Sequence, residues 1–260
     1  MKYLPPLVIA NWKMNPQTRR AAEALARAVG RAARGARGVR VAVAPPFPFL
    51  AAVGARAKPA ALAAQDVFWE RAGPYTGEVS PAMLRDAGVR YAIVGHSERR
   101  RLLAEDDAAV NRKVRALIAA GITPVIAVGE GLEESRAVVP RALADGLARA
   151  LVGVAPRQAG RIVIAYEPVW AISTASGGQA DTPAHATSRA IYLRKLLARM
   201  LGRRSADAVR IIYGGSVSAR NAADYLARDI RGMEGLLVGA ASLDAKEFAA
   251  ILRAVAVRHR

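Results

Sequence analysis

Short apolar runs recur along this chain at intervals of roughly thirty residues, and stretches with helical periodicity separate them. Runs such as IVIA and VRIIY are continuously apolar, as is typical of parallel strands that are buried on both faces. Eight strands joined by helices predict an α/β fold in which the sheet closes into a (β/α)8 barrel. The expected strands are Leu7–Ala10, Val39–Val43, Ala60–Ala64, Tyr91–Val94, Thr123–Val128, Ile162–Ala165, Val209–Tyr213 and Leu236–Val238.

A doubly wound parallel sheet is the competing architecture for this alternation. In a dinucleotide-binding sheet of that kind, G-x-G-x-x-G follows the first strand, whereas NWKMN stands there in this chain. No linker, charge block or low-complexity segment divides the sequence. We therefore expect residues 1–260 to form a single barrel domain.

Several residues predict where the helices begin and end. Asn15–Pro16 is expected to open the first helix and Thr182–Pro183 the sixth. Asp244 followed by Glu247 resembles a capping box at the start of the last helix. Gly121 is expected to close the fourth helix.

The chain carries a formal net charge of +18. A basic surface can hold nucleic acid or attract anionic substrates. The excess is nearly all Arg, spread along the chain among Ala residues, and no basic run is interleaved with aromatic residues. A compositional bias accounts for most of the charge, and we expect no nucleic-acid partner.

Composition also restricts the chemistry and the location. Without cysteine the chain has no thiolate nucleophile and no Cys-ligated metal, and His96, His185 and His259 share no ligand spacing. No stretch approaches 18 uninterrupted apolar residues, so we expect no membrane span. Pro5 and Pro6 interrupt the apolar N-terminus, which indicates a first strand rather than a signal peptide. We expect a cytoplasmic protein without a metal.

Polar residues fall directly after the expected strands, where a parallel barrel gathers its catalytic groups. Asn11 and Lys13 follow the first strand, His96 and Glu98 the fourth, and Glu167 the sixth. A carboxylate, an imidazole and an amine suit proton abstraction beside a carbonyl, which needs no cofactor. In that reaction Glu167 takes the proton and His96 polarises the carbonyl oxygen. Lys13 and Asn11 stabilise the negative charge of the enediolate.

Glycine-containing turns follow the last two expected strands. Gly214, Gly215 and Ser216 come after the seventh strand, and Gly239 comes after the eighth. A single glycine is more often an ordinary turn residue. Two such turns on neighbouring strands of a barrel favour a cradle of backbone N–H groups for a phosphate.

The polar residues also have structural interpretations. His96 could be a hydrogen-bonded structural residue, although its place before SERR predicts a helix N-terminus, which disfavours imidazolium. Lys13 could be a solvated surface lysine. Glu98 is either a partner for Lys13 or an acid in the first turn of a helix.

The chain resembles the triosephosphate isomerase family over essentially its whole length. The motifs that carry the resemblance are NWKMN at 11–15, GHSERR at 95–100, AYEPVWAI at 165–172, YGGSV at 213–217 and VGAASL at 238–243. The resemblance implies a TIM barrel that interconverts dihydroxyacetone phosphate and glyceraldehyde 3-phosphate in glycolysis and gluconeogenesis.

The resemblance also implies roles for individual residues. Glu167 matches the catalytic base, His96 the electrophile, and Lys13 with Asn11 the substrate-binding pair. Backbone phosphate contacts are implied for Ser216, Gly239 and Ala240.

The family's assembly is carried over in the same way. A homodimer is expected, or a tetramer, in which the loop at about 65–80 inserts into the partner subunit with Tyr75 and Thr76 at its tip.

The sequence departs from the family pattern in three places. STASGGQADTP, at 173–183, replaces a shorter glycine-rich lid, so we expect the N–H of Ser173 to reach the phosphate and assign no lid contact beyond it. Ala240 replaces a glycine of the cradle, and Ala127 replaces a cysteine, which we interpret as a packing change. Two alternatives stay open: a non-catalytic phosphate or nucleic-acid binder, and an isomerase whose altered lid releases enediolate to phosphate elimination.

Overall fold

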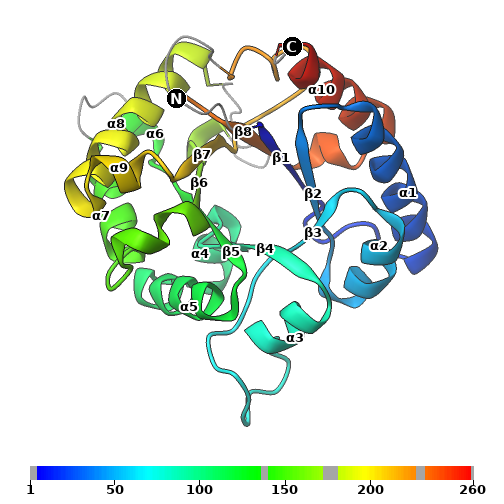
Figure 1. The fold of residues 1–260 in the computed structure, drawn as a ribbon, viewed down its shortest axis with the longest axis horizontal. Coiled ribbons are helices and arrows are strands. Elements are labelled where there is room, and N and C mark those ends of the chain that lie inside the picture. The colour runs from blue at the N-terminus through cyan, green and yellow to red at the C-terminus, as the bar shows by residue number, and fades with distance from the viewer. Residues whose placement is uncertain (1–4, 136–139, 172–180, 227–231, 259–260) are drawn as a thin grey trace.

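The computed structural model describes residues 5–135, 140–171, 181–226 and 232–258, and these contain a closed barrel of eight parallel strands surrounded by helices (Figure 1). The predicted strands are all present, and their boundaries differ from the prediction by two residues at most. The strands are β1 (Leu7–Asn11), β2 (Arg40–Ala44), β3 (Ala61–Ala64), β4 (Val89–Val94), β5 (Thr123–Val128), β6 (Val163–Tyr166), β7 (Arg210–Tyr213) and β8 (Gly235–Val238).

Closure of the sheet excludes the doubly wound alternative. Strand β1 pairs in parallel with both β2 and β8, for example through Leu7 opposite Arg40 and Leu7 opposite Gly235. All eight strands therefore run in one direction, and their carboxyl ends meet at one rim of the barrel.

Helices and short 3-10 turns connect the strands and cover the outside of the barrel (Figure 1). The α-helices are α1 (Arg19–Gly35), α2 (Leu50–Arg56), α3 (Pro81–Asp86), α4 (Ser97–Leu103), α5 (Asp107–Ala120), α6 (Leu132–Ser135), α7 (Arg141–Ala150), α8 (Pro183–Leu201), α9 (Arg203–Ala206) and α10 (Ala245–Arg258). The 3-10 turns are η1 (Phe47–Phe49), η2 (Pro156–Arg161), η3 (Val169–Ala171) and η4 (Ala240–Ser242).

Side chains from each strand divide between two hydrophobic clusters. In β1, Val8 belongs to the cluster shared with the helices, whereas Leu7 and Ile9 belong to a second cluster formed mainly by strand residues. Successive side chains of a strand point to opposite faces, so both faces of the sheet are dry. This double burial explains why the strands read as continuous apolar runs.

The helix boundaries agree with the prediction at three of four places. Thr182 caps α8 and Gly121, with φ +76°, ends α5. Asp244 accepts from the first N–H groups of α10, but Glu247 accepts from the N–H of Ala219 instead of completing a capping box.

The predicted start of the first helix at Asn15–Pro16 is wrong. Helix α1 begins at Arg19, because the hydroxyl of Thr18 accepts the N–H of Ala21 and so caps the helix there. Gln17 lies before this cap, where its amide donates to the carbonyl of Met14. The residues between β1 and α1 therefore form a loop at the rim.

Two further features of the chain concern its surroundings. Within the described ranges, no helix is both long enough and apolar enough to span a membrane. The loop between β3 and α3 extends away from the barrel (Figure 1), and the side chains of Tyr75 and Thr76 on this loop are exposed.

Candidate active site

A cavity of about 90 Å³ opens at the carboxyl-terminal rim, and we call it the rim pocket. The loops after β1, β4, β6, β7 and β8 all contribute to it. Its lining residues are Asn11, Lys13, His96, Glu167, Gly214, Gly215, Ser216, Val217, Leu237, Gly239, Ala240 and Ala241.

Most residues singled out in the sequence lie in this pocket. Glu98 does not line it but contacts Lys13, which does. Thr76 is exposed on the extended loop and does not line the pocket of this chain. Ser173 lies outside the described residues, as does most of the expected lid.

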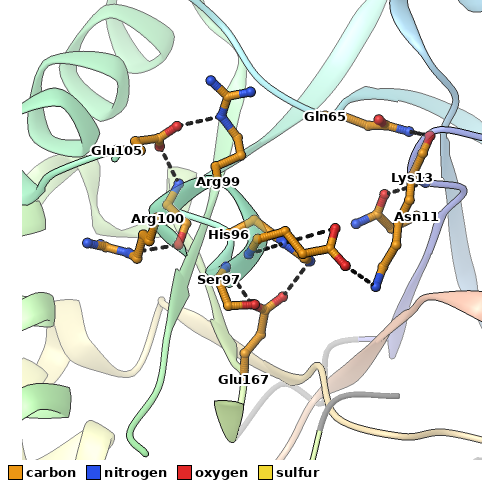
Figure 2. Close-up of polar contacts among 11 residues, drawn as sticks. Asn11, Lys13, Gln65, His96, Ser97, Arg99, Arg100, Glu105 and Glu167 are labelled. Atoms are coloured by element: carbon orange, nitrogen blue, oxygen red, sulfur yellow. Dashed lines mark hydrogen bonds and ion pairs between the residues drawn. The ribbon is translucent and has the colours of Figure 1, made fainter. Parts of the chain in front are cut away.

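Glu167 lies directly after β6 and is 2% exposed. Its backbone N–H donates to the carbonyl of Val128 at 2.8 Å, which fixes the residue against β5. Its carboxylate accepts from the N–H of Ser97 at 3.3 Å and faces His96, with 3.3 Å between Oε1 and Nε2 (Figure 2). The carboxylate is therefore buried but held by two neighbours from the loop after β4.

Two glycines make room for this glutamate. A Cβ on Gly129 would lie 1.7 Å from the carbonyl oxygen of Glu167, and one on Gly214 would lie 2.8 Å from its Cγ. Neither contact is possible between real atoms, and at Gly129 the obstacle is backbone. The close approach of β5, β6 and β7 around Glu167 thus requires residues without side chains.

His96 is the N-cap of α4, as its place before SERR predicts. Its Nδ1 accepts the N–H of Glu98 at 3.2 Å, so a neutral ring carries its proton on Nε2. That proton points toward Oε1 of Glu167, and the side chain is 9% exposed. The loop thereby presents a neutral imidazole donor to the rim pocket.

Lys13 is held in an unusual backbone conformation, with φ +52°. Its N–H donates to Oδ1 of Asn11 at 3.0 Å, and the amide of Gln65 donates to its carbonyl and to that of Ala44, each at 2.8 Å. Its Nζ lies 2.6 Å from Oε1 of Glu98 (Figure 2). The ammonium group is thereby directed across the rim toward the loop after β4.

The loops after β7 and β8 contribute mainly backbone. Ser216 donates both its N–H, at 3.1 Å, and its hydroxyl, at 2.8 Å, to the carbonyl of Ala171. Gly239 precedes η4, and a Cβ placed on it would lie 3.4 Å from Cε of Lys13. Gly239 therefore lies beside the lysine, whereas the N–H of Ser216 is occupied by the carbonyl of Ala171.

A buried cluster of charges supports the loop that carries His96. Glu105 accepts from the N–H of Gly95 at 2.9 Å and from Arg99 (Figure 2), while Lys113 bridges Glu105 at 2.9 Å and Asp66 at 2.7 Å. Burial raises the pKa of Asp66, and the charge of Lys113 opposes that rise. Burial would also raise the pKa of Glu105, but Lys113 and Arg99 hold it below its usual value. The cluster ties the loop after β3 to the loop after β4.

Three contributors to the site were not assigned a role from the sequence: Gln65, the N–H of Ser97 and Gly129. Gln65 follows β3 directly, and a polar residue immediately after a barrel strand is the signal that identified the others. The contact of Ser97 involves its backbone N–H, so its residue type gave no indication. A single glycine such as Gly129 is more often an ordinary turn residue.

These features together define a class of protein. A carboxylate, an imidazole and an ammonium group converge with backbone N–H groups on the catalytic rim of a (β/α)8 barrel. Such a site belongs to a barrel enzyme that performs acid–base chemistry on a small anionic substrate.

Comparison with known proteins gives the particular family. The family model described as triosephosphate isomerase matches residues 6–255. Proteins named triosephosphate isomerase are similar over nearly their whole length: that of Symbiobacterium thermophilum is 45% identical over 96% of this chain and 97% of its own. Those of Carboxydothermus hydrogenoformans and Pelobacter propionicus are 42% and 44% identical, over 95% and 94% of this chain and 98% and 96% of their own. The chain belongs to the triosephosphate isomerase family.

Proposed function

We propose that this chain interconverts dihydroxyacetone phosphate and D-glyceraldehyde 3-phosphate, as its family membership implies, and that Glu167, His96 and Lys13 carry the reaction. The supporting observation is that Oε1 of Glu167 and Nε2 of His96 are 3.3 Å apart in the same pocket as Lys13. A substrate carbon that enters between them can meet a base and a hydrogen-bond donor together.

The proton transfers follow from this arrangement. The ionised carboxylate of Glu167 removes a proton from the hydroxymethyl carbon next to the carbonyl, and the electron pair of that C–H bond forms the C=C bond of the enediolate. His96 donates from Nε2 to the carbonyl oxygen, on which negative charge develops. The oxyanion then takes the Nε2 proton of His96, and the ring recovers a proton from the hydroxyl on the first carbon, whose oxygen becomes the aldehyde oxygen. Glu167 returns its proton to the former carbonyl carbon, which completes the aldehyde. No external oxidant or reductant is required.

Lys13 and Asn11 provide the remaining electrostatic stabilisation. The ammonium group lies in the rim pocket, and Asn11 orients the lysine through the bond from its N–H. A positive charge in a largely desolvated pocket stabilises both the enediolate and the phosphate. The net charge of +18 also favours the approach of a dianionic substrate.

The phosphate is expected to bind at the backbone of Ser216, Gly239 and Ala240. These residues line the pocket on the side of β7 and β8. Because the N–H of Ser216 donates to the carbonyl of Ala171, a phosphate at this position exchanges one acceptor for another. Substrate binding is therefore coupled to the position of η3, which begins two residues after Glu167.

A coupled assay with glyceraldehyde 3-phosphate tests the assignment. Glu167→Gln is expected to lower kcat by about 10³-fold, because the amide cannot take a proton. Asp86→Asn, which alters an exposed carboxyl on α3, is the matched control and should have wild-type activity. Absence of turnover in the pure wild-type protein contradicts the function, and an active Glu167→Gln variant contradicts the role of the base.

The assembly is proposed to be a homodimer, with a tetramer as the alternative. Large apolar side chains are exposed on and near the extended loop: Met14 is 80%, Tyr75 41% and Met83 59% exposed. A second copy would bury them and bring Thr76 toward the partner's rim pocket. The molar mass measured by light scattering tests this, since a monomeric mass contradicts it.

The compartment we propose is the cytoplasm, and the pathways are glycolysis and gluconeogenesis.

A further inference from the structure

His185, on the first turn of α8, contacts three segments around the rim. Its Nδ1 lies 2.8 Å from Oδ1 of Asp181, and its Nε2 lies 3.2 Å from the carbonyl oxygen of Ser135 at the end of α6. Its ring also meets the edge of Trp170 in η3, with 5.8 Å between ring centres. Figure 1 shows α6 and α8 side by side, and the contact between His185 and Ser135 joins them.

Both ring nitrogens of His185 face oxygen atoms. A carbonyl oxygen only accepts hydrogen bonds, and so does an ionised carboxylate. A neutral imidazole has one N–H and can donate to one of the two. Only the doubly protonated ring donates to both Asp181 and Ser135.

Asp181 depends on this histidine for its charge balance. The carboxyl side chain is fully buried. Oδ1 accepts from the N–H of Thr182 at 2.7 Å and from His185, while Oδ2 has no hydrogen-bond partner in the described structure. Burial raises the pKa of Asp181, and the positive charge of His185 opposes that rise. A neutral ring would leave a buried carboxylate without a cation, which is costly.

The other charged groups around the ring are already paired. Arg189, one turn further along α8, donates to Glu130 at 3.0 Å and to the same carbonyl of Ser135 at 2.6 Å. Glu130 also accepts the hydroxyl of Tyr166 at 2.9 Å. Arg189 therefore balances Glu130, and His185 balances Asp181.

We propose that His185, as an imidazolium, is a positioning residue for the isomerisation assigned above. It fixes Asp181 and α6 relative to Trp170, and Trp170 stands three residues after Glu167. The same turn is fixed by the bond from Val169 to the carbonyl of Glu130 and by Ser216 at Ala171. His185 thus acts on the base and the phosphate site through η3, without touching substrate.

The sign of the pH dependence follows from the two acceptors. The contacts are complete while the ring is doubly protonated, and one of them is lost when the ring is neutral. His185→Gln keeps a neutral donor and removes the charge. At mildly acidic pH this variant is expected to have about tenfold lower kcat than the wild type, because small displacements of a catalytic group are costly.

The decisive measurement is the ratio of wild-type to variant kcat across pH. The ratio should be largest at mildly acidic pH and approach one at alkaline pH, with a smaller change in KM. Lys195→Gln, which removes an exposed positive charge from the same helix, should match the wild type at every pH. A ratio that stays constant with pH overturns the proposal. A wild type without turnover contradicts the proposed function instead.

A second measurement does not depend on the variant folding. NMR of the wild-type protein with ¹⁵N-labelled histidine is expected to show protons on both ring nitrogens of His185 at mildly acidic to neutral pH. A ring protonated only on Nε2 there means that Asp181 carries the proton, and this result also overturns the proposal.

Discussion

The two halves of the rim pocket are built from different parts of the chain. After β1, β4 and β6, the pocket is lined by functional side chains, and Glu167 and His96 are almost fully buried. After β7 and β8, its described lining includes Gly214, Gly215 and Gly239 and contains no ionisable side chain. The function of the first half therefore depends on the chemical identity of its side chains. The function of the second half depends on the absence of side chains, which would block the approach of a ligand to the backbone. Substitutions in the two halves should affect different kinetic constants.

The largest effect is expected in the side-chain half. His96→Gln should lower kcat by about 10²- to 10³-fold, because the donor to the developing oxyanion is displaced from the position that the imidazole holds. Competitive inhibition by inorganic phosphate should not change, because the cradle is intact. Steady-state kinetics with phosphate as inhibitor measures both. A matching loss of phosphate affinity would show that the two halves are not separable.

A smaller effect of a different kind is expected at Gly215. A Cβ there would lie 2.1 Å from the hydroxyl oxygen of Tyr213, whose buried ring is stacked on Tyr225 with 3.9 Å between ring centres. Since the ring has little room to move, the cradle must shift, at a cost of about 1–3 kcal/mol. Gly215→Ala should raise KM and the inhibition constant for phosphate by about tenfold or more, with a lesser effect on kcat. Unchanged phosphate binding would contradict this.

The smallest effect is expected from the same substitution at Gly239. Its Cβ would meet Cε of Lys13 at 3.4 Å, which is an ordinary contact with a flexible side chain. Gly239→Ala should change KM by no more than about threefold, because tolerated substitutions fall within about 0.5 kcal/mol. The pair of glycine variants compares one added methyl group at two places in the cradle. An equal increase in KM for both variants would mean that any added methyl group weakens phosphate binding, whether or not it contacts the stacked ring of Tyr213.

The sequence predicted the side-chain half more completely than the backbone half. Glu167, His96 and Lys13 were identifiable because an ionisable residue directly after an apolar strand needs an explanation. The glycines at 214, 215 and 239 indicated the cradle. The bond between the N–H of Ser216 and the carbonyl of Ala171 was not predictable, because any residue offers those atoms.

In the fold as well, some features were predictable from the sequence and others were not. The eight strands were predictable because double burial leaves a continuous apolar signal. The start of α1 was missed because Asn15, Pro16 and Thr18 all favour a helix start, and the choice among them depends on which side chain reaches a free N–H. In the same way, Glu247 resembled half of a capping box, but the tertiary fold places the N–H of Ala219 within its reach. Local patterns cannot include such distant partners.

The left-handed backbone conformation of Lys13 limits how far the stability of the protein can be raised without loss of activity. A side chain at φ +52° is strained by about 1 kcal/mol, and glycine would relieve that strain. The ammonium group that projects into the rim pocket would disappear with it. At this position, the residue that favours stability and the residue that favours turnover are therefore different. Selection for heat resistance alone is expected to replace Lys13 early and so to lower catalytic activity.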